Sequence, residues 1–201
     1  MNRKIIALFG GSFNPPLFSH FSLAEQLLNS DNNIEKIIFV PVSNKYKKIE
    51  LISDEHRFNM LNLACKKNPK FEVSDIEFNS PRQPYTFETL QAMQKKYPKN
   101  EIRLIIGTDN LKELDTWYEI EQLLNSFKVF VLTRDEDNIE EIINNHNLLS
   151  KYYHSFVKTN ISIRTNLSST FVRNEIKKNN SVRYLLPDEV INYIEKNNLY
   201  L

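Results

Sequence analysis

The chain has 201 residues, with 26 Lys and Arg against 25 Asp and Glu and a formal net charge of +1. A length of this order fits one domain with a full hydrophobic core, so we expect residues 1–201 to form a single domain. The balanced charge excludes a broad electrostatic footprint for nucleic acid or an anionic membrane surface. A single cysteine, Cys65, excludes an intramolecular disulfide and a cysteine-based metal cluster. With no window near the roughly 20 apolar residues of a membrane span, these features predict a cytoplasmic protein.

The first half of the chain alternates apolar runs with helical patterns. Short runs rich in Ile, Val and Phe predict buried strands at 4–9, 36–41 and 71–74. Apolar residues spaced three to four apart predict helices at 20–29, 54–67 and 86–97. The polar stretch before the third helix contains Pro81 and Pro84, which predicts a loop.

The second half continues the alternation and then becomes helical. The same criteria predict strands at 102–107, 128–133 and 156–163. Helices are expected at 119–125, 138–148, 168–178 and 187–197. This β-α-β-α order predicts an α/β fold, a doubly wound parallel sheet with right-handed crossovers and a small C-terminal helical part over about 165–201.

The three glycines fall at the carboxyl ends of two predicted strands. Gly10 and Gly11 follow the run 4–9, and Gly107 ends the run 102–107. If these two strands are neighbours, the glycines face one crevice, where open parallel sheets bind ligands. The stretch GGSF matches neither the GxGxxG fingerprint nor a P-loop, so an ordinary tight turn remains the alternative.

Two further segments carry residue types that bind anions. His20 lies where a predicted helix begins, and N–H groups at a helix start favour an anion that an imidazole can also contact. An ordinary surface histidine is the alternative. In LSSTFVRNEI, Ser168 or Ser169 can cap the next helix, with Arg173 about one turn further on. This combination suits a triphosphate, although Ser-Ser-Thr is also a common capping sequence.

Other candidates lie at the same predicted edge of the sheet. Asp109 can hydrogen-bond a ribose hydroxyl, and Trp117 can stack on a flat ring, although a single Trp is more often a core residue. A small basic cluster follows the second strand and consists of Lys45, Lys47 and Lys48. Such a cluster is usually a solvated face, so only its position favours a role in binding.

Four segments in a fixed order together resemble the bacterial nicotinate-nucleotide adenylyltransferases. They are GGSFNPPLFSH, YTFETL, GTDNL followed by Trp117, and LSSTFVR followed by YLLPDEVINYIEKNNLY. The similarity extends over nearly the whole chain. It implies the Rossmann-like fold of the nucleotidylyltransferase superfamily, whose pattern contains GG[ST]FDP, HxGH and ISSTxIR elements.

The resemblance implies a role for each matched position. Residues lining the bound nucleotides would be Gly10, Gly11, Ser12, Phe13, Gly107 and Asp109. His20 would contact ATP phosphate as the second histidine of HxGH. The triphosphate would be gripped by Ser168, Ser169, Thr170 and Arg173, with a catalytic lysine at Lys47 or Lys48. Residues toward the pyridine nucleotide would be Thr86, Trp117 and Arg134, with Trp117 stacking on nicotinate.

The sequence departs from the family pattern at four positions. Leu17 stands at the first histidine of HxGH, Ser19 at its glycine and Asn14 at the aspartate of the opening element. Asn180 replaces a glycine after the last element, a mild change because Asn tolerates the left-handed conformation. The loss of one phosphate donor at Leu17 predicts a slower enzyme, provided that His20 and Arg173 stay aligned.

The implied reaction is attack by the phosphate of nicotinate mononucleotide on the α-phosphorus of ATP, which gives the dinucleotide and pyrophosphate. Such transfers depend on positioning and charge stabilisation, with Mg²⁺ accompanying the triphosphate. No carboxylate cage for a dedicated metal site is visible in the sequence. Two alternatives stay open: a nucleotidylyltransferase with another acceptor, such as phosphopantetheine or a sugar or polyol phosphate, and a nucleotide-binding pseudoenzyme. The sequence also leaves open nicotinate against nicotinamide and the oligomeric state.

Overall fold

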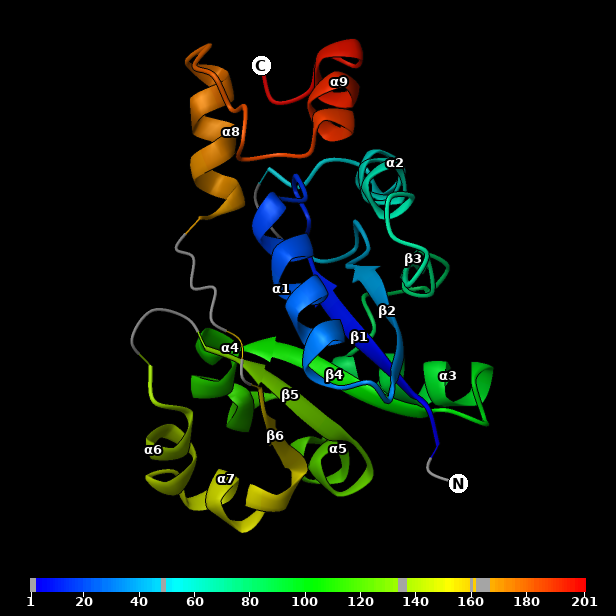
Figure 1. Ribbon diagram of the computed structural model, residues 1–201, viewed down its shortest axis with the longest axis vertical. Helices are drawn as coiled ribbons and strands as arrows, with labels where there is room; N and C mark the ends of the chain where they lie inside the picture. Colours follow the sequence, from blue (N-terminus) through cyan, green and yellow to red (C-terminus); the bar gives the residue numbers. More distant parts are fainter. Residues whose placement is uncertain (1–2, 48–49, 134–136, 160, 162–166) are drawn as a thin grey trace.

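The computed structural model describes residues 3–47, 50–133, 137–159, 161 and 167–201. Its centre is a six-stranded parallel sheet in the order β3-β2-β1-β4-β5-β6. The strands are β1 (Ile5–Gly11), β2 (Ile34–Pro41), β3 (Phe71–Val73), β4 (Glu101–Gly107), β5 (Lys128–Leu132) and β6 (Phe156–Lys158). The predicted α/β class with a doubly wound parallel sheet is confirmed (Figure 1).

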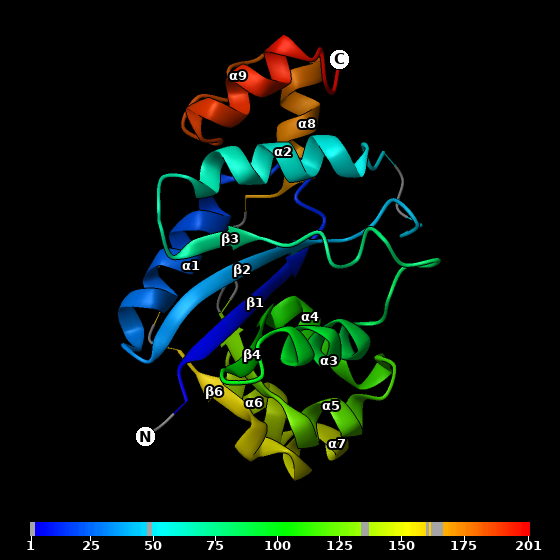
Figure 2. The same cartoon turned by 90° about the vertical axis from the view of Figure 1, so that its right-hand side faces the viewer.

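Helices follow most strands and cover the sheet on two sides, as the view in Figure 2 shows. They are α1 (Phe18–Ser30), α2 (Asp54–Cys65), α3 (Thr86–Lys96), α4 (Thr108–Lys112), α5 (Ile120–Ser126), α6 (Ile139–Asn144), α7 (Asn147–Lys151), α8 (Ser169–Lys177) and α9 (Asp188–Lys196). Two 3-10 turns are η1 (Leu114–Thr116) and η2 (Tyr153–Ser155). In the part of the chain that the structure describes, none of these helices is long and apolar enough to cross a membrane.

The structure differs from the sequence expectations in three places. The helix expected at 138–148 is two short helices: the first ends at Asn144, and His146 caps the second, since its Nδ1 accepts two N–H groups of that helix. Within the strand expected at 156–163, only β6 forms, and residues 160, 162 and 163 lie outside the described residues. After α8, the residue in the left-handed conformation is Asn179, with φ 56°, and not Asn180, to which the sequence analysis assigned it. Asn180 instead donates its N–H to the Glu175 carbonyl.

The strand order reverses between β1 and β4, the two neighbours at the centre of the sheet. Their parallel register pairs Ile5 with Glu101 and Phe9 with Ile105. The two strands that end in glycine are therefore neighbours, as the predicted shared crevice requires, and their carboxyl ends lie at the same edge of the sheet. In open parallel sheets this reversal is where ligands bind.

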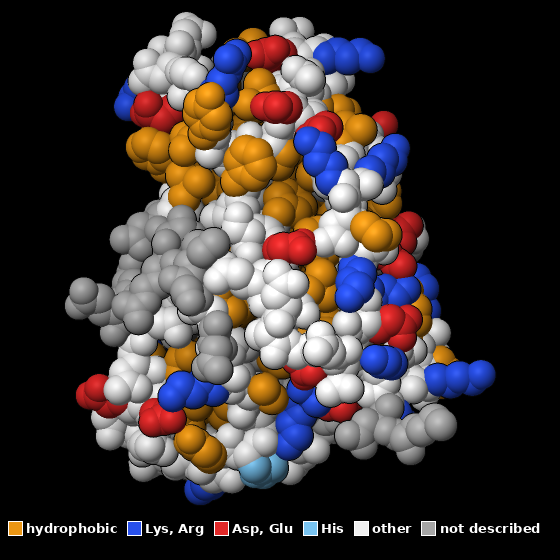
Figure 3. All heavy atoms as spheres, viewed as in Figure 1, with side chains coloured by type: hydrophobic (Ala, Val, Ile, Leu, Met, Phe, Trp, Pro, Cys, Tyr) orange, Lys and Arg blue, Asp and Glu red, His pale blue; other side chains and the backbone are white. Residues whose placement is uncertain are grey.

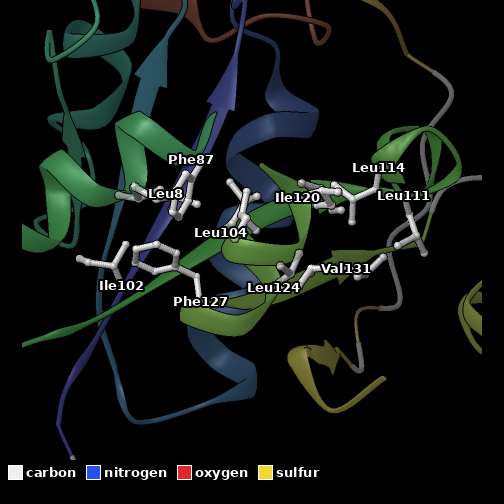
Figure 4. Close-up of a cluster of buried hydrophobic side chains, with 14 of the residues drawn as sticks. Leu8, Phe87, Ile102, Leu104, Leu111, Leu114, Ile120, Leu124, Phe127 and Val131 are labelled. Atoms are coloured by element: carbon white, nitrogen blue, oxygen red, sulfur yellow. The ribbon is translucent and has the colours of Figure 1, made fainter. Parts of the chain in front are cut away.

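Apolar side chains alternate along β1 and supply both layers of the core. Leu8 packs on one face with side chains of β4, β5 and the helices α3, α4 and α5, as Figure 4 shows. Ala7 points to the other face, where Ala24, Leu27 and Leu61 of α1 and α2 cover it. Each buried aliphatic side chain of this kind contributes about 1.5–3 kcal/mol, so the two layers hold the strand ends in place.

A third apolar cluster attaches the C-terminal helices to the rest of the molecule. Val172 of α8 and Val190 of α9 are fully buried against Met60 of α2 and Leu17 before α1. Figure 1 shows α8 and α9 together above the carboxyl ends of β1 and β2. Hydrophobic side chains also gather on the surface over α8 and the start of α1 (Figure 3), the region in which Phe171 is half exposed. The cluster thus places the start of α8 beside the loop that follows β1.

Candidate functional site

The glycine loop, residues 10–17, connects β1 to α1. No atom outside Gly10 and its chain neighbours lies within 4 Å of a Cβ built there, whereas a Cβ on Gly11 would lie 3.1 Å from the Phe13 ring. The left-handed backbone of Phe13, at φ 45°, turns its ring inward, and the side chain is 2% exposed. The ring is therefore a core group, which leaves the backbone of the loop to face a ligand.

His20 lies in the first turn of α1, beside the glycine loop. Its ring meets the Phe13 ring edge-on at 5.0 Å. Nδ1 accepts the backbone N–H of Leu17 at 2.9 Å, so the neutral ring carries its proton on Nε2. The local backbone thereby fixes the tautomer that presents an N–H donor at Nε2, the form suited to contact a phosphate oxygen.

Leu17, where the resemblance leads us to expect the first histidine of HxGH, has a packing role. Its side chain is 1% exposed and belongs to the apolar cluster with Met60, Val172 and Leu186. The side chain therefore points toward the C-terminal helices, while its N–H serves His20. A leucine is suited to this environment because an imidazole there would lose its hydration.

The start of α8 is tied to the glycine loop across most of the sequence. Ser168 caps the helix, since its Oγ accepts the Phe171 N–H at 3.2 Å. Ser169 donates its hydroxyl to the Pro15 carbonyl at 2.9 Å. The two motifs that the sequence singled out as anion sites are therefore brought together, with the positive end of a helix dipole at their junction.

Arg173 is buried behind this junction, with 6% of its surface exposed. Nη1 donates to the Asn14 carbonyl at 3.0 Å, and Nη2 lies 3.2 Å from a Glu50 carboxylate oxygen and 3.4 Å from the Thr170 hydroxyl. Among the described residues, the buried Nε–H has no hydrogen-bond acceptor. The guanidinium therefore adds a positive charge behind the junction, with its Nε enclosed by the protein.

Glu50 neutralises the cations of α8. Its carboxylate lies 2.6 Å from the Lys177 Nζ as well as beside Arg173. Hydrogen bonds from Lys177 and then Arg173 hold the pKa of this carboxyl below its usual range. An anionic ligand that approaches Arg173 therefore competes with a carboxylate that belongs to the chain.

Gly107 ends β4 and forms the N-cap of α4. A Cβ there would run into the Asp109 carboxylate, so a larger residue would have to displace that side chain. Asp109 is exposed in the first turn of α4. Both residues lie at the edge of the sheet that the glycine loop shares, as predicted.

An aromatic pair joins the start of α3 to the segment that follows η1. Tyr85 and Tyr118 stack with ring centres 4.4 Å apart and planes 19° apart, each about half exposed. Tyr85 precedes Thr86, the first residue of α3, and Tyr118 follows the partly buried Trp117. The stack therefore places the segments that contain Thr86 and Trp117 side by side, two positions that the sequence linked only by resemblance.

The two lysines of the basic cluster after β2 that the structure describes differ in their surroundings. Lys45 donates to the carbonyls of Phe78 and Ser80, so it connects two loops. Lys47 is exposed. Lys48 and Arg134 lie outside the described residues, and their predicted roles stay predictions.

Sequence reasoning missed Arg57, a fully buried residue at the base of the site. Its guanidinium donates to the Ser12 carbonyl at 3.1 Å, to Asn44 at 3.2 Å and to Asp54 at 2.5 Å. It thus holds the loops after β1 and β2 together. Burial lowers its pKa, and Asp54 partly offsets this. Its spacing on the apolar face of α2, three residues before Met60, was the available signal.

The described residues contain no group of three or more His, Cys, Asp or Glu side chains that could hold a metal ion. The acidic residues nearest the site are used otherwise, since Glu50 pairs with cations and Asp54 with Arg57. A resident metal therefore has no ligand set in the described part of the site.

Comparisons with known proteins agree with this arrangement. The cytidylyltransferase-like family model matches residues 8–175. The chain is 36% identical over 196 residues to a probable nicotinate-nucleotide adenylyltransferase of Carboxydothermus hydrogenoformans, with 97% of each chain covered. It is also 36% identical to a protein of the same description from Lachnoclostridium phytofermentans, over 99% of this chain and 100% of that one.

A solved structure supports the fold. The Plasmodium falciparum nicotinic acid mononucleotide adenylyltransferase complexed with NaAD superposes with a TM-score of 0.77 at 23% identity, covering 98% of this chain and 97% of that one. At this identity the likeness concerns the fold. Family model and sequence relatives together show that the chain belongs to the cytidylyltransferase-like family and, within it, to the nicotinate-nucleotide adenylyltransferases.

Proposed function

We propose that the chain transfers the adenylyl group of ATP to nicotinate mononucleotide, a step of NAD biosynthesis that gives deamido-NAD and pyrophosphate. The observation that carries this proposal is the hydrogen bond from Ser169 to the Pro15 carbonyl, which joins the start of α8 to the glycine loop. It supports the proposal because two anion-binding segments then converge where β1 and β4 reverse the strand order.

In the proposed reaction, a phosphate oxygen of the mononucleotide attacks the α-phosphorus of ATP. The new P–O bond forms as the bond to the departing pyrophosphate breaks. His20 would donate Nε2–H to a phosphate oxygen, in the tautomer that Leu17 fixes. The N–H groups at the start of α8 would hold the triphosphate, and the positive charge of Arg173 behind them would stabilise it. These groups act by position and charge and form no covalent intermediate.

We place the pyridine ring at the other end of the edge. Trp117 would stack on it, with the start of α3 at Thr86 beside it. A flat ring gains stacking energy on an indole, and N–H groups at a helix start suit the carboxylate of nicotinate. The acceptor phosphate would then point back toward His20.

We propose that Mg²⁺ enters as part of the ATP substrate. The described residues offer no cluster of metal ligands, so the triphosphate oxygens would supply the ligands. The metal would neutralise charge on the pyrophosphate that leaves.

The decisive experiment measures pyrophosphate release by the purified protein with ATP and Mg²⁺. The acceptors are nicotinate mononucleotide, nicotinamide mononucleotide and phosphopantetheine, each tested alone. We expect turnover with the first, at a rate that reflects one missing phosphate donor, a loss on the order of 10²–10³ for a fully engaged group. Turnover with only another acceptor would reassign the substrate.

The packing role of Leu17 keeps a second candidate in view, a protein that binds nucleotide without turnover. Isothermal titration with ATP separates the two. ATP binding without pyrophosphate release on any acceptor would favour this second function.

A further inference from the structure

The chain after α9 turns back to the glycine loop. The Leu199 N–H donates to the Ile194 carbonyl, and Tyr200 takes the left-handed conformation with φ 66°. This turn directs the Tyr200 hydroxyl to the Asn14 side-chain oxygen, at 2.8 Å. The contact joins residues 186 positions apart, although neither belongs to a helix or strand.

Asn14 uses all of its hydrogen-bonding groups that face the interior, and it is only 1% exposed. Its Nδ2 donates to the Glu50 carbonyl at 2.8 Å, and its own carbonyl accepts Nη1 of Arg173 at 3.0 Å. With the amide nitrogen directed at a carbonyl, the side-chain oxygen must find a donor elsewhere. Tyr200 supplies it.

The chemistry of the phenol suits a permanent donor. Burial raises the pKa of the Tyr200 hydroxyl far above its ordinary value, and the nearby guanidinium groups of Arg173 and Arg57 lower it less. The hydroxyl therefore stays protonated well above neutral pH. Because Asn14 is buried, the loss of this donor would leave an oxygen without a partner.

We propose that Tyr200 is a positioning residue for the triphosphate site: it fixes Asn14, and Asn14 in turn holds the glycine loop against Arg173. This inference rests on the proposed function. It assigns Tyr200 to one end of the site only, because Trp117, Tyr118 and Thr86 at the other end belong to segments that β4 and α3 hold in place.

The difference between the two ends of the site can be measured with Tyr200→Phe. This variant removes one oxygen and leaves another unpaired, which costs only part of the stability typical of such a domain. The matched control is Tyr193→Phe. The Tyr193 hydroxyl lies 3.0 Å from His56 and 3.1 Å from Asn59, so it joins α9 to α2 away from the glycine loop. Thermal midpoints without ligand report the structural cost of each variant.

We expect Tyr200→Phe to raise the KM for ATP about tenfold, since misplacement of one buried group is worth about one hydrogen bond. The KM for nicotinate mononucleotide should stay within about twofold of wild type. A general loss of structure would raise both KM values, so a change for ATP alone identifies a positioning role. Tyr193→Phe should leave both KM values unchanged. Equal shifts for both substrates, or a Tyr200→Phe enzyme that matches the control, would overturn the inference.

Titration with ATP separates this inference from the proposed function. If wild type releases no pyrophosphate with any acceptor but binds ATP, the proposed function fails, and weaker ATP binding by Tyr200→Phe than by Tyr193→Phe still supports the positioning role. Equal ATP affinity of the two variants would contradict the positioning role of Tyr200. Absence of ATP binding by wild type would end both proposals.

Discussion

The two ends of the proposed site are built in opposite ways. At the triphosphate end, Asn14, Arg173 and Tyr200 are buried and linked by hydrogen bonds, so their positions are set before any ligand arrives. At the pyridine end, Tyr85 and Tyr118 form a stack in which each side chain is about half exposed. We infer that ligand binding at the triphosphate end depends on the exact positions of fixed polar groups, whereas binding at the pyridine end depends on the area of aromatic contact.

The largest expected effect comes from the buried end. Arg173→Lys keeps the charge but removes the planar group that reaches both the Asn14 carbonyl and Glu50. We expect kcat/KM to fall on the order of 10²–10³. Arg183→Lys, an exposed arginine, is the matched control and should stay near wild type. A lysine enzyme with a rate within a few-fold of wild type would mean that charge alone suffices there.

The next effect tests the exposed end. Trp117→Leu removes the ring on which the pyridine would stack but keeps an apolar contact with the core. Aromatic stacking on a base is worth about 1–3 kcal/mol, so the KM for nicotinate mononucleotide should rise roughly 5-fold to 100-fold with little change for ATP. Tyr153→Ala removes a similarly exposed aromatic ring elsewhere and should change neither constant. A larger effect on ATP would reverse the assignment of the two ends.

A third variant asks whether Leu17 is a lost catalytic group or a core residue. Leu17→His places an imidazole in the cluster of Met60, Val172 and Leu186, which should lower the free energy of unfolding by about 1–3 kcal/mol. We expect no gain in kcat, because the side chain points away from the glycine loop. Leu17→Met keeps the volume and should cost less than about 1.5 kcal/mol. Denaturant unfolding measures the stability of each variant, and pyrophosphate release measures its kcat. A large gain in kcat for Leu17→His would contradict the packing role.

The smallest effect concerns the internal anion. Glu50→Gln removes the charge that pairs with Arg173 and Lys177 while keeping the carbonyl that Asn14 uses. Because the Glu50 carboxylate is exposed to solvent, these pairs are weak, and we expect only about a twofold to threefold fall in the KM for ATP, largest at low salt. Glu175→Gln, which breaks a pair with Lys178 on the same helix, serves as control. An increase in the KM for ATP would show that Glu50 supports the site.

Local sequence patterns were sufficient for the strands and most helices, whereas the shared edge depended on β1 and β4 being neighbours, which the structure shows. The glycines after β1 and β4 and the cap at Ser168 depend on neighbours in the chain, so they could be recognised without a structure. The cap at His146 that splits a predicted helix was missed because Nδ1 acts there as the acceptor, a less common choice than a hydroxyl or carboxylate.

The connections within the site could not be predicted in the same way. Leu17 faces helices more than 150 positions later in the chain, and nothing in its own segment distinguishes a packing role from a lost histidine. Arg57 and Tyr200 contact loops whose course is set only once the sheet has formed. The residues that we propose bind a ligand left a pattern in the sequence, whereas those that hold them in place did not.

The central pairing of β1 with β4 has a consequence for how the molecule opens. The site spans the boundary between β3-β2-β1 and β4-β5-β6, two halves that this single pairing connects within the sheet. A ligand bound across that boundary must be released before the halves separate, so it raises the free energy of opening for both. Amide hydrogens in β2 and in β5, on either side, should therefore exchange more slowly in the same proportion when the nucleotide is bound.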